Sequence, residues 1–92
     1  MFFVYILVSC LDGSLYIGQT SGMKKRLREH NGGRVKVTRS RAPFALGYFE
    51  EFGTRREAMW REWELKKKFN TDRKKQMIAA FDRRKAEMLL GL

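Results

Sequence analysis

The chain has 92 residues, and its 20 Lys and Arg against 10 Asp and Glu give a formal net charge of +10. This length predicts one domain, residues 1–92, with a modest core, and the charge makes a polyanion, most simply nucleic acid, the expected partner. The lone cysteine, Cys10, excludes an internal disulfide and a cysteine-based metal site. The apolar opening, residues 1–8, lacks a basic leader and is too short to span a bilayer. We therefore expect a cytoplasmic protein with no membrane partner, a monomer or weak dimer.

A β-hairpin is predicted at the start of the chain. Residues 2–9 are rich in Phe, Val, Tyr and Ile, which favours a strand. Because this run is apolar on both faces, we expect it to be the central strand of a sheet. Asp12-Gly13 is a hairpin turn signal, so residues 14–20 are predicted to return as the second strand.

The length of the hairpin loop decides where two tyrosines fall. A four-residue loop, residues 10–13, pairs Tyr5 with Gly18 and makes Tyr5 and Tyr16 diagonal neighbours on one face. A two-residue turn keeps both on that face but moves them apart, and the sequence leaves the two registers open. Gly18 opposite Tyr5 indicates either a close approach by another group or a simple bulge.

A helix is predicted to follow, with Ser21 as its cap and residues 31–33 as its end. Arg26 and His30 are four residues apart, so they share one flank of the inward stripe. Lys24 points elsewhere, where a solvated face with loose phosphate contact is expected. For His30 alone a half-buried structural histidine is the usual reading, and its pairing with Arg26 beside two tyrosines favours a functional one.

A basic loop, residues 32–43, joins this helix to a predicted third strand, residues 44–52. Loops of this length tend to be functional or mobile. We expect its cations to contact a nucleic-acid backbone. They are Arg34, Lys36, Arg39 and Arg41.

A second helix is predicted to start after Thr54, which forms a capping box with Glu57. Glu62 falls inside the apolar stripe of this helix, and an inward carboxylate needs a cation or strong donors beside it. Two partners stay open: a Lys or Arg salt bridge, or a divalent metal, for which oxygen ligands suit Mg²⁺ or Mn²⁺. The stripe consists of Ala58, Met59, Trp63, Leu65 and Phe69.

The end of the chain predicts further helix. Residues 70–72 break the pattern and can cap a helix with Met77, Ile78 and Phe81 inward. The tail, residues 83–92, is predicted to be a short helix folded onto the core or a weak self-association surface. Three lysines in this half are further candidates for nucleic-acid contact: Lys66, Lys74 and Lys75.

These residues point to phosphodiester chemistry. The single histidine and cysteine exclude a zinc cluster, and no glycine-rich phosphate cradle or second inward carboxylate is present. Hydrolysis of a phosphodiester needs an activated water, neutralised phosphoryl oxygens and a stabilised leaving oxygen. Arg26 can hold the phosphate, a metal on Glu62 can stabilise the leaving oxygen, and Tyr16 or Tyr5, with His30 nearby, can take the proton of the water.

Four motifs in order give the chain a resemblance to GIY-YIG nuclease domains, specifically to the small stand-alone bacterial group. The match covers nearly the whole chain, and residues 43–50 also resemble the third strand of that group. The motifs are Phe3-Val4-Tyr5, Tyr16-Ile17-Gly18, Arg26-x-x-x-His30-Asn31 and Glu62-x-x-Leu65-Lys66.

The resemblance implies an α+β fold, a three-stranded antiparallel sheet flanked by helices. It implies a metal-dependent DNA endonuclease, similar to the GIY-YIG domains of excision-repair nucleases and homing endonucleases. It also implies one divalent metal on Glu62, a phosphate on Arg26, and Tyr5 and Tyr16 in the site, without deciding which tyrosine is the base.

The chain departs from the family pattern at three places. Phe3 replaces the first glycine of the first motif, and Gln19 stands where some relatives have lysine. A late asparagine of larger relatives has no clear counterpart, because Asn70 is nearer to Glu62 than expected and Lys74 or Lys75 stands nearer the expected position. An alternative is therefore a non-catalytic basic module that binds nucleic acid and acts with partners in DNA repair or processing.

Overall fold

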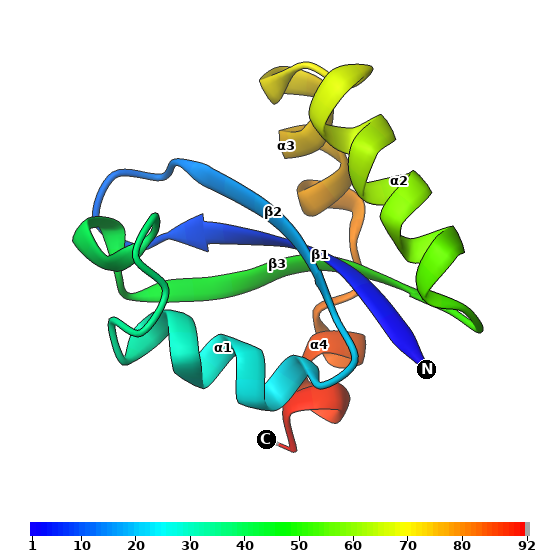
Figure 1. Ribbon diagram of the computed structural model, residues 1–92. Coiled ribbons are helices and arrows are strands. Elements are labelled where there is room, and N and C mark those ends of the chain that lie inside the picture. The colour runs from blue at the N-terminus through cyan, green and yellow to red at the C-terminus, as the bar shows by residue number, and fades with distance from the viewer. Residues whose placement is uncertain (92) are drawn as a thin grey trace.

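The computed structural model describes residues 1–91 and shows three strands, four α-helices and a 3-10 turn among them (Figure 1). No helix in this range is long and apolar enough to cross a membrane. In chain order the elements are β1 (Phe2–Ser9), β2 (Leu15–Thr20), α1 (Met23–Asn31), η1 (Arg39–Arg41), β3 (Phe44–Phe52), α2 (Arg55–Lys67), α3 (Thr71–Ala80) and α4 (Arg83–Leu90).

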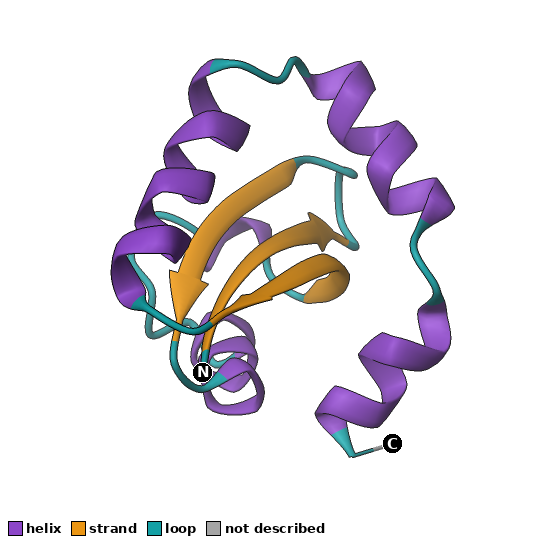
Figure 2. Ribbon diagram, turned by 90° about the vertical axis from the view of Figure 1, so that its right-hand side faces the viewer, coloured by secondary structure: helices purple, strands orange, loops and turns teal. Residues whose placement is uncertain are grey.

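The three strands form one antiparallel sheet with the order β2-β1-β3, which confirms the predicted central position of β1. Alternate residues of β1 enter two separate cores. Phe3, Tyr5 and Leu7 pack with α1 and α4 on one face, whereas Val4 and Ile6 pack with α2 and α3 on the other. Figure 2 shows the strands framed by the helices. The fold is therefore α+β, as predicted.

The hairpin has the longer of the two loops that the sequence allows. The Ser9 N–H donates to the Ser14 carbonyl oxygen at 2.8 Å, which closes a four-residue loop. Tyr5 consequently pairs with Gly18 and Leu7 with Tyr16. This register places the two tyrosine rings on one face, with their centroids 6.4 Å apart.

The prediction that Ser21 caps α1 is wrong. Gly22 occupies the cap position, and no side chain accepts a hydrogen bond from the first turn of the helix. Thr20 Oγ1 instead accepts from the Gly22 N–H at 3.1 Å, so the chain turns into α1 one residue later than predicted. The predicted caps of the later helices are confirmed, since Thr54 caps α2 and Asn70 caps α3.

The predicted inward stripe of α2 is only partly correct. Ala58 and Leu65 are seven residues apart, nearly two full turns, so both point at the sheet, where they are fully buried. Met59 and Trp63 are rotated away from that direction by about 100° or more, and they are 54% and 42% exposed. One narrow sheet covers only one side of this helix.

The tail folds back on the core, as one of the two predictions for it proposed. Ala86 of α4 is buried, and Leu89 and Leu90 pack against the core on the α1 side of the sheet. Leu92 lies outside the described residues.

Candidate active site

The Tyr5 side chain extends over Gly18 on the neighbouring strand β2. A Cβ built on Gly18 would stand 2.6 Å from Tyr5 Cζ and closer still to its hydroxyl oxygen. The ring therefore lies directly on the Gly18 backbone, which confirms the predicted close approach. Any larger residue at position 18 would push the ring away.

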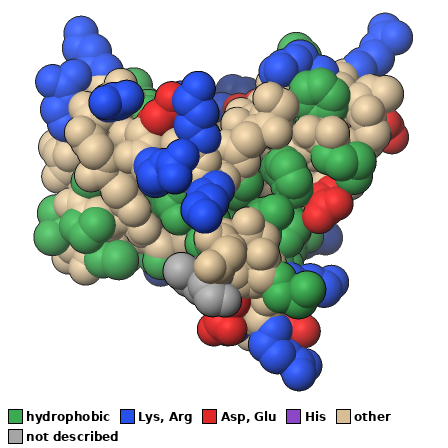
Figure 3. Space-filling view, turned by 90° about the horizontal axis from the view of Figure 1, so that it is seen from below, with side chains coloured by type: hydrophobic (Ala, Val, Ile, Leu, Met, Phe, Trp, Pro, Cys, Tyr) green, Lys and Arg blue, Asp and Glu red, His purple; other side chains and the backbone are tan. Residues whose placement is uncertain are grey.

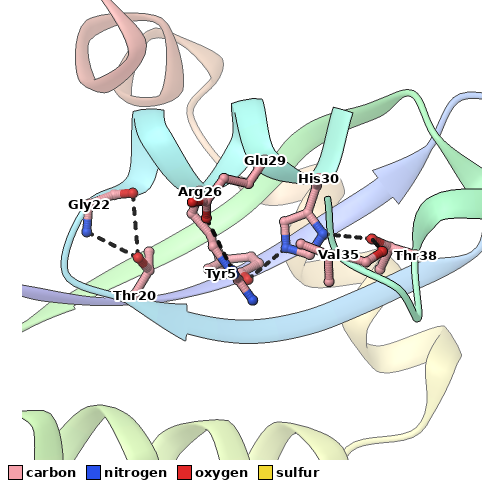
Figure 4. Close-up of polar contacts among 8 residues, drawn as sticks. All are labelled: Tyr5, Thr20, Gly22, Arg26, Glu29, His30, Val35 and Thr38. Atoms are coloured by element: carbon pink, nitrogen blue, oxygen red, sulfur yellow. Dashed lines mark hydrogen bonds and ion pairs between the residues drawn. The ribbon is translucent and has the colours of Figure 1, made fainter. Parts of the chain in front are cut away.

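The Tyr5 hydroxyl begins a buried chain of hydrogen bonds (Figure 4). It lies 3.0 Å from His30 Nε2, and His30 Nδ1 lies 2.8 Å from Thr38 Oγ1. Thr38 donates its own proton to the Val35 carbonyl oxygen at 3.3 Å, so it accepts from Nδ1–H. We therefore assign His30 the neutral tautomer in which Nε2 accepts the Tyr5 proton.

Thr38 is the member of this chain that the sequence did not reveal. It lies in the loop expected to bind nucleic acid, yet its side chain is completely buried. A second polar anchor sits beside it: Asn31 accepts from the Phe44 N–H at 2.6 Å and donates to the Phe44 carbonyl oxygen at 3.1 Å. These contacts link residues distant in sequence, and no local pattern signals them.

Burial keeps both ends of the Tyr5–His30 contact neutral. It raises the pKa of Tyr5 to about 12, while the Arg26 guanidinium beside the hydroxyl lowers that pKa by a smaller amount. It lowers the pKa of His30 to about 4, and the positive charge of Arg26 lowers the same pKa further. At neutral pH the pair is thus a hydroxyl and a neutral imidazole.

Tyr16 and Arg26 lie at the more exposed mouth of this buried chain. The Tyr16 ring centroid is 5.0 Å from that of His30, and the residue is half-buried. Arg26 is also half-buried, and its Nη1 pairs with Glu29 Oε1 at 3.1 Å. The predicted group of Tyr5, Tyr16, Arg26 and His30 therefore comes together around one point.

Glu62 approaches from the opposite face of the sheet. Figure 1 shows α1 below the sheet and α2 above it, so the site straddles the β2 edge. The Glu62 carboxylate is near enough for its charge to contribute to the raised pKa of Tyr5. Its side chain is 21% exposed, and its Oε2 lies 2.7 Å from Lys66 Nζ. The predicted salt-bridge partner is thus present.

The position of α2 is set by a strong ion pair on its other flank. The Arg61 guanidinium donates to both carboxylate oxygens of Glu50 on β3, with distances between 2.9 and 3.2 Å. The Tyr48 hydroxyl donates to the same carboxylate. A bidentate pair of this kind has a defined orientation, so it holds Glu62 on the side of α2 that faces the β2 edge.

A hollow of about 300 Å³ joins the two sides of the site. It is lined by Arg26 and Glu29 of α1, Gln19 of β2 and Arg55 of α2, and Arg55 Nη1 donates to Gln19 Oε1 at 3.3 Å. A phosphate placed here would meet two guanidinium groups from different helices.

The family model for the GIY-YIG catalytic domain matches residues 1–76. The chain belongs to the GIY-YIG family.

Relatives of this GIY-YIG domain are small proteins named UPF0213. The chain is 49% identical to one from Haloquadratum walsbyi over 84% of each protein. It is 50% identical to one from Bacillus licheniformis, over 68% of this chain and 66% of the relative. The solution NMR structure of a UPF0213 protein from Bacillus halodurans is 38% identical, with a TM-score of 0.52 over 86% of this chain and 84% of that one. GIY-YIG domains form a nuclease superfamily whose members generally use a divalent metal.

The donors of this GIY-YIG domain fit such a metal in one specific way. Residues 1–91 contain no group of three or more His, Cys, Asp or Glu that could hold an ion by themselves. Mg²⁺ commonly keeps several waters and binds through one or two carboxylates plus the phosphate of a substrate. Glu62, a carboxylate that is 21% exposed and paired with Lys66, suits that arrangement.

The predicted nucleic-acid contacts fall into two groups. Three have partners within the chain: Arg41 donates to Ser14 Oγ at 2.8 Å, Lys74 to the Leu65 carbonyl oxygen at 3.2 Å, and Lys66 pairs with Glu62. The others are exposed, namely Lys24, Arg34, Lys36, Arg39 and Lys75. Figure 3, seen from below the view of Figure 1, shows Lys and Arg side chains spread over this face, with hydrophobic and a few acidic side chains between them.

Proposed function

We propose that this GIY-YIG domain is a metal-dependent endonuclease that hydrolyses DNA phosphodiesters with one metal ion. The observation that carries the proposal is the buried contact between the Tyr5 hydroxyl and His30 Nε2 beside Arg26. The Tyr5 hydroxyl therefore lies next to a proton acceptor, the neutral imidazole of His30, and next to an anion-binding group, the guanidinium of Arg26.

Tyr5 and His30 would act as a proton relay. As Tyr5 takes the proton of the attacking water, its own proton passes to His30 Nε2, which is free to accept it. Thr38 holds the imidazole in the required tautomer through Nδ1–H. The raised pKa of Tyr5, about 12, means that no standing tyrosinate is present at neutral pH. Tyr16, at the mouth of the site, is the alternative base.

Arg26 would hold the phosphate, since a guanidinium binds two phosphate oxygens at once. Its pairing with Glu29 keeps it extended toward the hollow. Glu62 would hold the metal, which when bound supplies positive charge at the leaving oxygen. Lys66 would leave the carboxylate as the metal enters.

The test is cleavage of supercoiled plasmid and of branched DNA with Mg²⁺ or Mn²⁺. We expect Glu62→Ala and Tyr5→Phe each to lower the cleavage rate by about a hundredfold or more, whereas a loss of that size in Tyr16→Phe alone would make Tyr16 the base. Glu64→Ala is the matched control, because Glu64 lies on the same helix and pairs with Arg61, which keeps Glu50. Cleavage that persists unchanged in both test variants contradicts the mechanism.

The second candidate function is a basic module that binds nucleic acid without cutting it, acting with partners in DNA repair or processing. The observation that favours it is the Lys66–Glu62 pair, which neutralises the carboxylate proposed to hold the metal. It predicts no cleavage with any metal, and an affinity that falls steeply with salt as phosphate contacts are lost. Equal affinity at low and high salt contradicts it.

A further inference from the structure

Both tryptophans of the chain lie on the outer face of α2. Trp60 is 66% and Trp63 42% exposed, and neighbouring Met59 is 54% exposed. The two indole rings stack on one another, with centroids 5.2 Å apart and planes 10° from parallel. An exposed apolar patch of this kind usually marks a binding surface, and here it borders a hollow of about 1010 Å³.

The surroundings of this Trp60–Trp63 platform are basic. Arg56 and Lys67 lie on the same stripe of the helix as the two indoles, since the positions are four, three and four residues apart. Lys68 Nζ lies 5.6 Å from the centre of the Trp63 ring. Within residues 1–91 no carboxylate is in ion-pair distance of these three cations.

Two acidic residues lie near the platform, and one of them, Glu57, lines the same hollow as the indoles. Glu57 holds the Thr54 hydroxyl at 2.9 Å, and Glu64 pairs with Arg61 at 3.6 Å. The three cations outnumber Glu57, so the platform presents aromatic faces with an excess of positive charge around them. Stacked aromatic rings beside cations are the combination that binds single-stranded nucleic acid, because bases stack on the rings while phosphates meet the cations.

We propose that Trp60 and Trp63 stack with unpaired bases of a nucleic-acid strand, whose phosphates contact Arg56, Lys67 and Lys68. A second copy of this chain is the poorer occupant, since two molecules of net charge +10 repel one another.

Resting on the proposed function, this platform defines the substrate class. Trp63 is adjacent to Glu62 on α2, one residue along the axis and about 100° around it. A strand lying on the platform passes within about one helix diameter of the site, roughly 10 Å. The substrate is then DNA that carries an unpaired segment next to the bond that is cut.

Intrinsic fluorescence tests the platform directly, because the chain contains only these two tryptophans. Oligothymidylate of about 12 nucleotides, added in EDTA to prevent cleavage, should quench the emission to saturation. Inorganic polyphosphate, which carries charge but no bases, should bind without that quenching. Equal quenching by both, or binding of the oligonucleotide without quenching, overturns the proposal.

Affinity measured by anisotropy of a labelled strand gives a second test. Trp60→Ala with Trp63→Ala should weaken single-strand binding about tenfold or more and change blunt-duplex binding by less than about threefold. Met88→Ala, at an exposed apolar residue of α4, is the matched control and should change neither. Equal losses on both nucleic acids, or dissociation of a dimer by the double variant in sedimentation, overturns the proposal.

These outcomes separate the platform from the nuclease. Quenching in EDTA with no cleavage in Mg²⁺ or Mn²⁺ leaves the platform standing and removes the endonuclease. Cleavage of plain duplex that the double variant keeps at full rate, together with unchanged single-strand affinity, removes the platform and leaves the endonuclease.

Discussion

The two sides of the candidate site differ in how the fold holds them. On the β1 and α1 side, Tyr5 and His30 are 1% and 0% exposed, and each hydrogen-bonding atom has a partner. Among residues 1–91 no buried side-chain nitrogen or oxygen lacks one. On the α2 side, Glu62 has a single exposed lysine as its partner, and two tryptophans face solvent.

Burial should decide which changes affect stability as well as activity. A buried polar network is costly to leave half satisfied, because the remaining atoms cannot reach water. An exposed ion pair contributes little to folding. We therefore expect changes on the β1 and α1 side to destabilise the fold, and changes on the α2 side to alter ligand binding with little effect on stability.

The largest effect is expected at Arg26. It tests whether the stability change follows the exposure of a side chain or the helix to which it belongs. Arg26 belongs to α1 but is half-buried at the mouth. Arg26→Ala should lower the rate of DNA cleavage by about a hundredfold or more, with unfolding stability changed by less than about 1 kcal/mol. Arg28→Ala, on the exposed face of α1, is the control. If Arg26→Ala lowers the free energy of unfolding enough to explain the lost cleavage, Arg26 belongs to the buried network instead.

Burial of His30 should make the free energy of unfolding depend on pH. The pKa of His30 is about 4 in the folded protein against 6.5 as its ordinary value. The unfolded chain therefore binds a proton that the folded one does not, and wild-type stability falls as pH drops from 6.5 to 4, by up to roughly 3 kcal/mol. His30→Gln lacks this term.

The measurement is urea unfolding of wild type and His30→Gln between pH 7.5 and about 4. The stability advantage of wild type should be largest above pH 6.5 and shrink toward pH 4. A gap that stays constant over this range would show that His30 titrates alike in both states.

A smaller loss of stability is expected from Gly18→Ala, which tests the contact between the Gly18 backbone and the buried Tyr5 ring. The added methyl would lie 2.6 Å from Tyr5 Cζ, which is well inside van der Waals contact, so the ring has to move. We expect a destabilisation of about 2 kcal/mol, measured by urea unfolding, together with loss of cleavage. Gly53→Ala is the control, because nothing lies within 4 Å of a Cβ there. Equal behaviour of the two variants would contradict the close contact.

The smallest effect belongs to the α2 side. Lys66→Ala removes the ammonium that lies 2.7 Å from Glu62, in a pair whose lysine side chain is 46% exposed. We expect half-maximal cleavage at a Mn²⁺ concentration a few-fold lower, and a stability change below about 1 kcal/mol. Lys85→Ala, at an exposed lysine of α4, should change neither. A higher Mn²⁺ requirement in Lys66→Ala would mean that the lysine assists the metal site.

Local patterns predicted the features that depend on neighbouring residues. The strand over residues 2–9 followed from its apolar run, the cap of α2 from Thr54 and Glu57, and the inward side of Glu62 from helical spacing. The wrong predictions concern burial, which depends on what packs against a residue. Met59 and Trp63 are apolar and were placed in the core, but the narrow sheet leaves their side of α2 uncovered.

Sequence patterns were enough to predict the three strands, the central position of β1, and the placement of Arg26 and His30 on one flank of α1, because these depend on periodicity and short loops. Three features needed the tertiary structure: the hairpin register, the burial of Thr38 behind His30, and the position of α2, which carries Glu62, across the sheet from Tyr5. Such contacts join distant residues, and their free energy comes from packing and desolvation that no short segment provides.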